Sequence, residues 1–262
     1  MDTDAVLELM REVAEQVINP RFRSLEAGQI MEKSPGDLVT VADREAEELI
    51  TAALLADDPS VLIVGEEATA ADPGLLDRLA DAEHAYTVDP VDGTKNFVNG
   101  SPDHAVMIAE LRHGEPVRAW ILQPAHDLTF VSEKGAGVYR NGEPLPMLTP
   151  VTDAAELRIA TSRPRLEGQH GEVNVRGTYW SCGIDYPWLA QGGVDALHYT
   201  RALPWDHAPG LLLLSELGGV VACADGTPYH PARHHEGCAG LLAASAPQTW
   251  ELAASHLRDV LR

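Results

Sequence analysis

The chain has 262 residues, 45% of them hydrophobic, and a formal net charge of −21 at pH 7. No apolar run approaches the roughly 18 residues of a spanning helix, and so negative a surface repels nucleic acid and anionic membranes. The acidic, amphipathic start lacks the basic and apolar regions of a signal peptide. We therefore expect a cytoplasmic protein that contacts neither nucleic acid nor membrane.

Two amphipathic helices are predicted at the start of the chain. Apolar residues from Val6 to Val17 fall on one face of the first, and those of "TVADREAEELITAALLAD" (40–57) do so in the second. Five short apolar runs follow that are typical of strands: 61–64, 85–89, 104–111, 117–124 and 128–134. The turn residues "HGEP" and "RNG" between the later runs favour hairpins. The first half is thus predicted to be an antiparallel sheet covered by two helices.

The Pro-rich stretch "PLPMLTPVTDAAEL" (144–157) is expected to join this half to a second one. Beyond it, strand patterns such as "LRIATS" and "DALHYT" alternate with helical patterns such as "DYPWLAQGG" and "WDHAPGLLLLSELGG". We expect an α+β first half and an α/β second half. Together they would form one domain over residues 1–262, with halves at about 1–148 and 149–262.

The stretch "DPVDGTKNF" (89–97) combines two carboxylates with a glycine and a threonine. Asp89 ends a predicted strand, and the residues before Asp92 cannot pair regularly. An extended D-P-x-D directs both carboxylates toward one point and leaves the carbonyl of Val91 as a third oxygen ligand, a set that suits Mg²⁺. The alternative interpretation is a simple turn, because Asp, Pro and Gly all favour turns.

The residues after the second acid indicate a short helix, with Thr94 as its N-cap and Gly100 just beyond its end. Its free backbone N–H groups would bind a phosphate, and Gly93 would let an oxyanion approach the backbone closely. The alternative is a capped helix without a ligand. Phosphoryl chemistry needs such donors beside metal-binding acids, so the two features together favour the functional interpretation.

Three more acids are candidates for the same site. Glu66 and Glu67 follow a strand and a glycine, and they are either ligands at a strand end or solvated loop charges. Asp206, in "PWDHAPG", is either a further ligand or a favourable acid in the first turn of an apolar helix.

Asp43 also has two interpretations. It lies three residues after Thr40, the spacing of a capping-box variant at a helix start. Alternatively, its carboxylate accepts a proton from Thr94, which would prepare that hydroxyl to polarise a water.

The three cysteines, Cys182, Cys223 and Cys238, match no zinc or redox spacing. Their odd number argues against a disulfide framework. We expect them to be small buried hydrophobic residues.

Histidines near the C-terminus offer a weaker signal. His230, His234 and His235 with Cys238 suggest zinc, but this minor alternative lies in a Pro- and Gly-rich region. His207 is expected to face solvent or to pack at the start of its helix.

Four stretches, "DLVTVAD", "GEE", "DPVDGTKNF" and "WDHAPG…SELGG", occur in the order typical of one family. They resemble the signatures of the inositol monophosphatase family, a Mg²⁺-dependent, lithium-sensitive phosphatase superfamily that includes fructose-1,6-bisphosphatase. The resemblance runs from about Asp37 to about Leu242. It implies a layered αβαβα sandwich, a homodimer, and hydrolysis of a phosphate monoester with two or three Mg²⁺.

The resemblance also implies the metal ligands. Those of the first Mg²⁺ would be Glu66, Asp89 and the carbonyl of Val91, and those of the second would be Asp89, Asp92 and Asp206. Four converging carboxylates repel one another by several kcal/mol a pair at an effective dielectric constant near 20, a roughly estimated value. Two Mg²⁺ would balance these charges and recruit a phosphate that the acidic surface repels.

Further roles follow from the same resemblance. The amides of Gly93 and Thr94 would hold the phosphate, and Asp43 with Thr94 would orient the attacking water. Glu66 counts among the catalytic residues and Asp206 among those that contact substrate. Glu67 is secondary, because the first glutamate of the pair matches the family pattern.

Two departures from the family pattern concern the substrate. Lys95 replaces the second threonine of the usual motif, a variant also found in members that act on histidinol phosphate. Tyr199 stands where inositol phosphatases carry a glutamate that contacts inositol hydroxyls. The substrate wall upstream corresponds to Ser181, Cys182 and Gly183.

Two other residues, Asp185 and Arg201, are either substrate contacts or structural. We expect a Mg²⁺-dependent phosphomonoesterase for a small polar, inositol-1-phosphate-like ester, acting by direct attack of a metal-activated water. The alternatives are a histidinol-phosphate phosphatase, another sugar or nucleotide phosphatase of this superfamily, and a non-catalytic phosphate-binding module.

Overall fold

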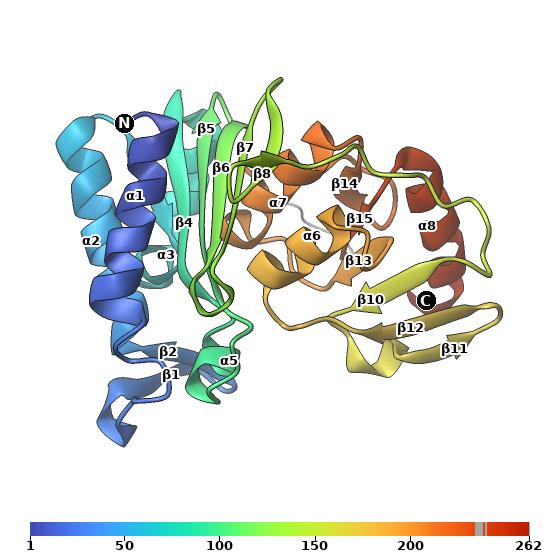
Figure 1. The fold of residues 1–262 in the computed structure, drawn as a ribbon, viewed down its shortest axis with the longest axis horizontal. Helices are drawn as coiled ribbons and strands as arrows, with labels where there is room; N and C mark the ends of the chain where they lie inside the picture. The colour runs from blue at the N-terminus through green and yellow to red at the C-terminus, as the bar shows by residue number, and fades with distance from the viewer. Residues whose placement is uncertain (234–237, 239, 262) are drawn as a thin grey trace.

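The computed structural model describes residues 1–233, 238 and 240–261, and its layers alternate between helices and sheets (Figure 1). Helices α1 and α2 cover one face of a seven-stranded sheet, and α6 and α7 separate that sheet from a six-stranded one. Helix α8 lies on the far side of the second sheet. The predicted αβαβα sandwich is therefore confirmed.

The first half holds the helices around the first sheet and the strands that form it. Their bounds are α1 Thr3–Val13, a π-helical turn Ala14–Ile18, η2 Ala27–Gln29, β1 Ile30–Ser34, β2 Asp37–Thr40, α2 Val41–Asp57, β3 Leu62–Gly65, α3 Glu66–Ala71, α4 Gly74–Asp81, β4 His84–Asp92, α5 Thr94–Val98, β5 Ala105–Arg112, β6 Glu115–Gln123, η3 Pro124–His126, β7 Leu128–Glu133, β8 Gly137–Arg140 and β9 Glu143–Pro144.

The second half holds the second sheet, the two helices between the sheets and the last helix. Its elements are β10 Arg158–Thr161, η4 Pro164–Leu166, β11 Gly168–His170, β12 Val173–Gly177, α6 Cys182–Ala190, β13 Ala196–Tyr199, α7 Pro204–Glu216, β14 Val220–Cys223, β15 Leu241–Ala244 and α8 Pro247–Leu261. The division of the chain at residue 148 stays a prediction.

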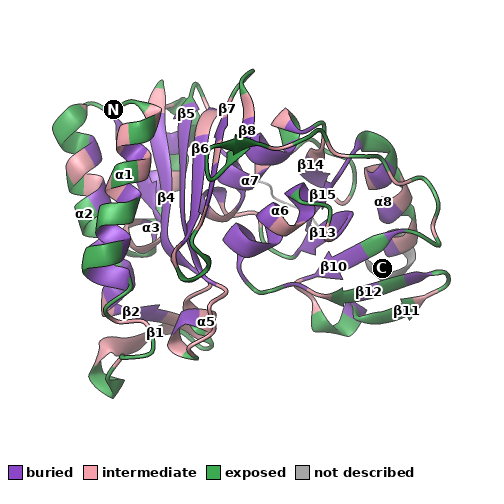
Figure 2. Ribbon diagram, viewed as in Figure 1, coloured by how far each residue is buried: buried purple, intermediate pink, exposed green. Residues whose placement is uncertain are grey.

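The two N-terminal helices form where the apolar spacing predicts them. In α1, Val6, Met10 and Val13 are buried toward the first sheet, and the Asp2 side chain caps the helix by accepting from the Ala5 amide at 2.8 Å. Figure 2 shows this inner face as buried and the outer face as exposed. Burying such a stripe is what holds a surface helix in place.

The first sheet is antiparallel except at one edge, where the prediction of an antiparallel sheet is wrong. Its strand order is β3-β4-β5-β6-β7-β8-β9, and β3 pairs with β4 in the parallel sense. The chain between these strands forms α3 and α4, and a crossover of this kind is what a parallel pair requires. The parallel pair brings the ends of β3 and β4 to the same edge.

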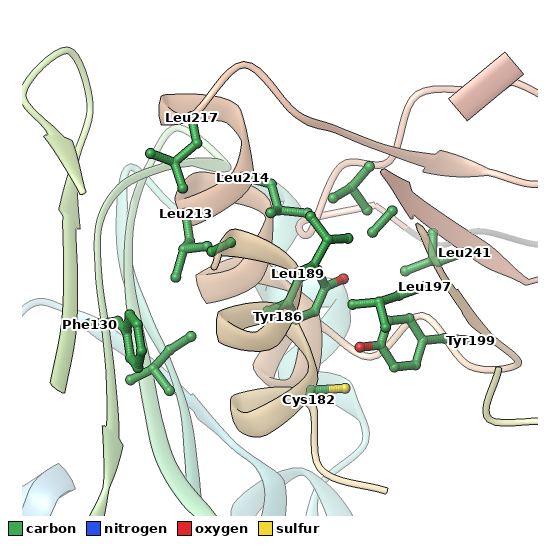
Figure 3. Close-up of a cluster of buried hydrophobic side chains, with 14 of the residues drawn as sticks. Phe130, Cys182, Tyr186, Leu189, Leu197, Tyr199, Leu213, Leu214, Leu217 and Leu241 are labelled. Carbon is green, nitrogen blue, oxygen red and sulfur yellow. The ribbon is translucent and has the colours of Figure 1, made fainter. Parts of the chain in front are cut away.

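The core between the sheets belongs to both halves of the chain. Figure 3 shows Phe130 of the first sheet, Tyr186 of α6, Leu213 of α7 and Leu197 of the second sheet within one apolar cluster. Helices α6 and α7 approach closely, since a Cβ on Gly210 would lie 2.3 Å from Cγ of Tyr186. Only glycine fits there, so the sequence fixes how near the two helices lie.

The cysteines differ from expectation. Cys223, at the end of β14, forms a disulfide with Cys238, and only Cys182 is a free buried thiol. The prediction of three independent hydrophobic cysteines is wrong, because the fold returns the chain beside β14 after 15 residues. Within the described ranges, none of the helices is long and apolar enough to cross a membrane.

Candidate active site

The acids of "DPVDGTKNF" lie at the buried end of the strand β4. The pairing of β4 with β5 is irregular between Asp89 and Asp92, as the sequence predicted. Asp89 is 2% exposed, and its Oδ1 has no hydrogen-bond partner among the described residues. A buried carboxylate oxygen without a donor is costly, and it favours a ligand at this point.

Asp92 is held by the start of α6. Its Oδ1 accepts from the Cys182 amide at 3.1 Å and its Oδ2 from the Gly183 amide at 2.7 Å, and the Ser181 hydroxyl donates to Oδ2 as well. These donors fix the carboxylate and leave it buried beside Asp89. The sequence indicated Ser181 only as substrate wall, so its contact with Asp92 was missed.

Asp206 completes a group of three carboxylates. It lies in the first turn of α7, as predicted, and offers an oxygen that lies within 4.8 Å of one oxygen each from Asp89 and Asp92. The parts of the chain that converge here are more than 100 residues apart.

Glu66 begins α3, directly after the parallel strand β3. It has a cation partner that was not predicted. The ammonium of Lys33, in β1, lies 2.6 Å from a carboxylate oxygen of Glu66 and 2.7 Å from one of Glu67. The charge of the predicted ligand Glu66 raises the pKa of Asp89, so Glu66 lies near the three acids. Its oxygens are nevertheless not among those of the converging group.

Burial and mutual repulsion raise the pKa of these carboxyls. Burial is the larger cause for both Asp89 and Asp206, and the charges of neighbouring acids add to it. Burial also raises the pKa of Glu66 to about 7, in spite of the opposing charge of Lys33. Burial raises that of Asp92 too, against the three hydrogen bonds that it accepts. An oxygen set this crowded fits a hard divalent cation, which would remove the repulsion.

Asp43, in the first turn of α2, contacts Thr94 of the motif that is predicted to bind phosphate. Its side chain accepts from the Thr40 amide at 2.9 Å, which confirms the capping box. The Thr94 hydroxyl lies 2.9 Å from Oδ1 of Asp43 and 3.1 Å from the Val91 carbonyl oxygen. The capping interaction and the contact with Thr94 thus involve the same side chain, and its role in preparing the hydroxyl for a water stays a prediction. Burial raises its pKa to about 6, although these hydrogen bonds oppose the shift.

The N-cap of the short helix α5 is Gly93, not Thr94 as predicted. Gly93 has φ +81°, and a Cβ there would lie 3.0 Å from both the Asp103 carbonyl oxygen and Cβ of Ser181. The chain therefore turns one residue earlier than the threonine suggested, because only glycine accepts this conformation and this contact. Gly100, with φ +73°, lies just beyond the helix end as expected.

A pocket of about 420 Å³ opens beside the acids. It contains seven positions that the sequence associated with substrate: Lys95, Ser181, Cys182, Asp185, Tyr199, Arg201 and Asp206. Ser162, Thr178, Trp180 and Thr200 also line it, and sequence reasoning did not single them out. Figure 3 shows Cys182 and Tyr199 near the start of α6.

Two further residues were missed or misplaced. Glu47 is buried and accepts from the Glu67 and Ala68 amides, both at 2.8 Å, so it holds the start of α3. Its position four residues after Asp43, on the same helix face, was the available signal. His207 is buried, with Nδ1 2.9 Å from the Tyr186 hydroxyl, so it packs at the helix start and does not face solvent.

The minor alternative of a zinc site at His230, His234, His235 and Cys238 lacks one of its predicted ligands. Cys238 is bonded to Cys223 and has no free thiolate for a metal. His234 and His235 lie outside the described residues, and His230 lies 3.6 Å from a carboxylate oxygen of Glu115.

Comparison with known proteins agrees with this geometry. The model of the inositol monophosphatase family matches residues 2–262. The chain is 33% identical to an inositol-1-monophosphatase of Mesorhizobium japonicum over 86% of this chain and 88% of the relative. It is 30% identical to a fructose-1,6-bisphosphatase/inositol-1-monophosphatase of Aquifex aeolicus, with 82% of each chain covered.

A solved structure shows the same fold. The crystal structure of the extragenic suppressor protein suhB from Bartonella henselae superposes with a TM-score of 0.77 and 26% identity, and covers 97% of this chain and 98% of that one. Fold, motifs and relatives agree along nearly the whole length. The chain belongs to the inositol monophosphatase family and is a phosphatase of that superfamily.

Proposed function

We propose that this phosphatase uses Mg²⁺ to hydrolyse a small polar phosphate monoester. The observation that carries the proposal is a group of three carboxylates, two buried and one half-buried, whose oxygens lie within 4.8 Å of one another, beside a pocket of about 420 Å³. One of them, Asp89, has an oxygen without a hydrogen-bond partner among the described residues. Relatives named as inositol-1-monophosphatase and as fructose-1,6-bisphosphatase/inositol-1-monophosphatase support a small phosphorylated metabolite as substrate.

The residues that would hold Mg²⁺ are those implied by the family motif, Glu66, Asp89, Asp92, Asp206 and the carbonyl of Val91. Their oxygens are the kind of ligand that Mg²⁺ prefers. When bound, the ion supplies charge for the phosphate oxygens and makes water a better nucleophile. The protein's part is to keep these oxygens converged in a buried place.

The protein would position water and phosphate from the neighbouring motif. The Thr94 hydroxyl, within hydrogen-bond distance of Asp43, would present its lone pair to the attacking water. The amides of Gly93 and Thr94 would face the phosphate, and Cys182 would form part of the substrate wall. Direct attack by water needs no protein nucleophile, so we propose that no covalent intermediate forms.

Phosphate release from a panel of monoesters tests the proposal. The panel contains inositol 1-phosphate, histidinol phosphate, a sugar phosphate and p-nitrophenyl phosphate, each assayed with Mg²⁺ and with EDTA. We expect release that EDTA abolishes and excess Mg²⁺ restores. No release from any ester would favour the non-catalytic module, and release that EDTA leaves intact would contradict the metal assignment.

The resemblance also supports proposals about assembly and location. We propose a cytoplasmic homodimer that lithium inhibits. Light scattering on the purified chain tests the dimer, and a lithium titration at fixed Mg²⁺ tests inhibition. A monomer at assay concentration would contradict the first of these proposals without affecting the catalytic one.

A further inference from the structure

The side chain of Trp180, which lines the pocket beside the acids, makes no contact with the described residues that would hold it in the fold. Four of the five tryptophans are held by the fold: Trp120 and Trp250 donate to backbone carbonyls, Trp188 stacks with an arginine, and Trp205 is in the core. Among the described residues, Trp180 has no ring contact, cation contact or side-chain hydrogen bond, and it is 53% exposed. An exposed indole contributes little to packing, whereas its apolar face in a pocket can contact a ligand.

The backbone of this residue has an unusual conformation. Trp180 has φ +62°, a region that bulky residues rarely enter because the side chain crowds the backbone. The next residue is Ser181, whose hydroxyl donates to Asp92. The strained residue thus lies directly before a segment that fixes one of the three acids, and backbone strain of this kind is concentrated at ligand sites.

The polar groups of the pocket indicate the charge of the ligand. Lys95 and Arg201 line it together with the acids Asp92, Asp185 and Asp206. Neither cation has an ion-pair partner among the described residues, although the charge of Arg201 acts on Asp206. Asp92 and Asp206 are carboxylates that Mg²⁺ would neutralise. The Tyr199 hydroxyl is buried there without a hydrogen-bond partner. The buried Asp185 also lines the pocket, and its Oδ1 accepts a hydrogen bond from the Tyr179 amide at 2.8 Å.

We propose that Trp180 forms an aromatic platform that selects phosphate esters whose alcohol carries a planar heteroaromatic ring without positive charge, as in a nucleoside monophosphate. The inference rests on the proposed function and names its substrate class. Rings stack on an exposed indole, whereas a polyol would need several paired donors and acceptors. The two unpaired cations disfavour a cationic alcohol such as that of histidinol phosphate.

A matched pair of substrates tests the platform, since 5′-AMP carries adenine at C1 of the ribose and ribose 5-phosphate carries a hydroxyl there. We expect the wild-type kcat/KM to favour 5′-AMP by about tenfold or more, the effect of one base–aromatic stack. Trp180→Gly should lower that ratio by about tenfold, and Trp180→Phe should keep most of it. Glycine is the natural replacement at φ +62°, so Trp180→Gly should fold, which circular dichroism and Tm check.

The control is Tyr179→Leu, which removes the neighbouring exposed ring. That ring packs against Trp188 at 5.1 Å, and the pocket lining does not include it, so the substrate ratio should stay unchanged. The proposal is overturned if wild-type protein prefers ribose 5-phosphate or histidinol phosphate to 5′-AMP. An equal loss on both members of the pair in Trp180→Gly would also overturn it.

A binding measurement separates this inference from the proposed function. If no ester is hydrolysed, the phosphatase assignment fails, yet calorimetric titration of 5′-AMP and ribose 5-phosphate in Mg²⁺ still compares the two ligands. Tighter binding of 5′-AMP that Trp180→Gly weakens by about tenfold supports the platform. Equal binding of both ligands overturns it.

Discussion

At the scale of single residues, the arrangement of charge decides what the site can do. An oxygen of Asp89 lies within 4.8 Å of oxygens of Asp92 and Asp206, and its Oδ1 has no hydrogen-bond donor among the described residues. Carboxyls crowded in this way destabilise the metal-free protein and become favourable only when a cation neutralises them. The candidate site therefore lowers the stability of the metal-free protein and, for the same reason, favours the binding of a cation.

The substitution Asp89→Asn tests both effects, on metal binding and on the stability of the metal-free protein. Turnover in Mg²⁺ should fall by more than about 100-fold, because losing even an outer partner of a metal site costs about 10- to 100-fold. The Tm in EDTA should stay equal or rise, since a repulsive charge is removed. Scanning calorimetry with and without Mg²⁺ measures the second effect, and Asp153→Asn, an exposed acid, is the control. Full activity in Asp89→Asn would refute its role as a ligand.

His104 gives a pH dependence that is separate from the acids. It is 1% exposed, its ring lies 4.8 Å from that of Phe22 and 5.0 Å from that of Phe97, and burial lowers its pKa to about 4. The unfolded chain binds a proton near the ordinary pKa of about 6.5, so it binds more protons than the folded chain between these values. Stability supplied by neutral His104 is thus complete above about pH 6.5 and is lost as the pH falls toward 4.

Urea unfolding from pH 7.5 to 4.5 measures this contribution. The free energy of unfolding of the wild type should fall relative to that of His104→Phe as the pH falls, because the variant keeps an aromatic ring in the cluster but has no imidazole to protonate. An identical pH slope in both proteins would show that His104 does not titrate as its burial indicates.

Much of the site could be predicted from local pattern, because the spacing of its motifs carries the chemistry. Asp89, Asp92 and Asp206 converge, and Asp43 meets Thr94. What the sequence could not show were contacts between segments without a motif. The bridge from Lys33 to Glu66 spans 33 residues, and nothing around the lysine indicates its partner.

At the scale of elements, the periodic helices and most strands were predicted, and so was the short helix α5 from its motif, but several other short elements were missed. The β1–β2 hairpin and helices α3 and α4 are too short or too polar to give a clear period. Missing α3 and α4 also hid the crossover that makes β3 and β4 parallel. The first sheet was predicted to be wholly antiparallel because these two helices were not predicted.

The disulfide joins the end of β14 to the residues before β15. Closing a loop of this sequence separation stabilises a fold by about 3 kcal/mol, which corresponds to roughly 6–12 °C in Tm for a chain of this size. We expect dithiothreitol to lower the Tm of the wild type by that amount. In Cys223→Ser, the Tm should already be low and should not respond to reductant. A wild-type Tm that reductant leaves unchanged would contradict a stabilising bond.

At the scale of the whole molecule, the net charge of −21 acts on every carboxylate at once. Self-repulsion of this size opposes the compact state, and salt screens it over about 10 Å at 0.1 M. The Tm in EDTA at pH 7.5 should therefore rise as KCl increases from 20 to 300 mM. The rise should be smaller at pH 5, close to the sequence pI of about 4.7. A Tm that falls with KCl at pH 7.5 would show that attractive ion pairs dominate.

The close contact between Gly210 and Tyr186 has a consequence for the chemistry at the other end of the same helices. It sets the spacing of α6 and α7, and those two helices deliver the partners of Asp92 and the carboxylate of Asp206. A methyl group at this crossing would wedge the helices apart and misalign oxygens that must meet within a few ångströms. The proposed affinity for Mg²⁺ would therefore depend on how closely α6 and α7 pack, and it should fall before the chain unfolds.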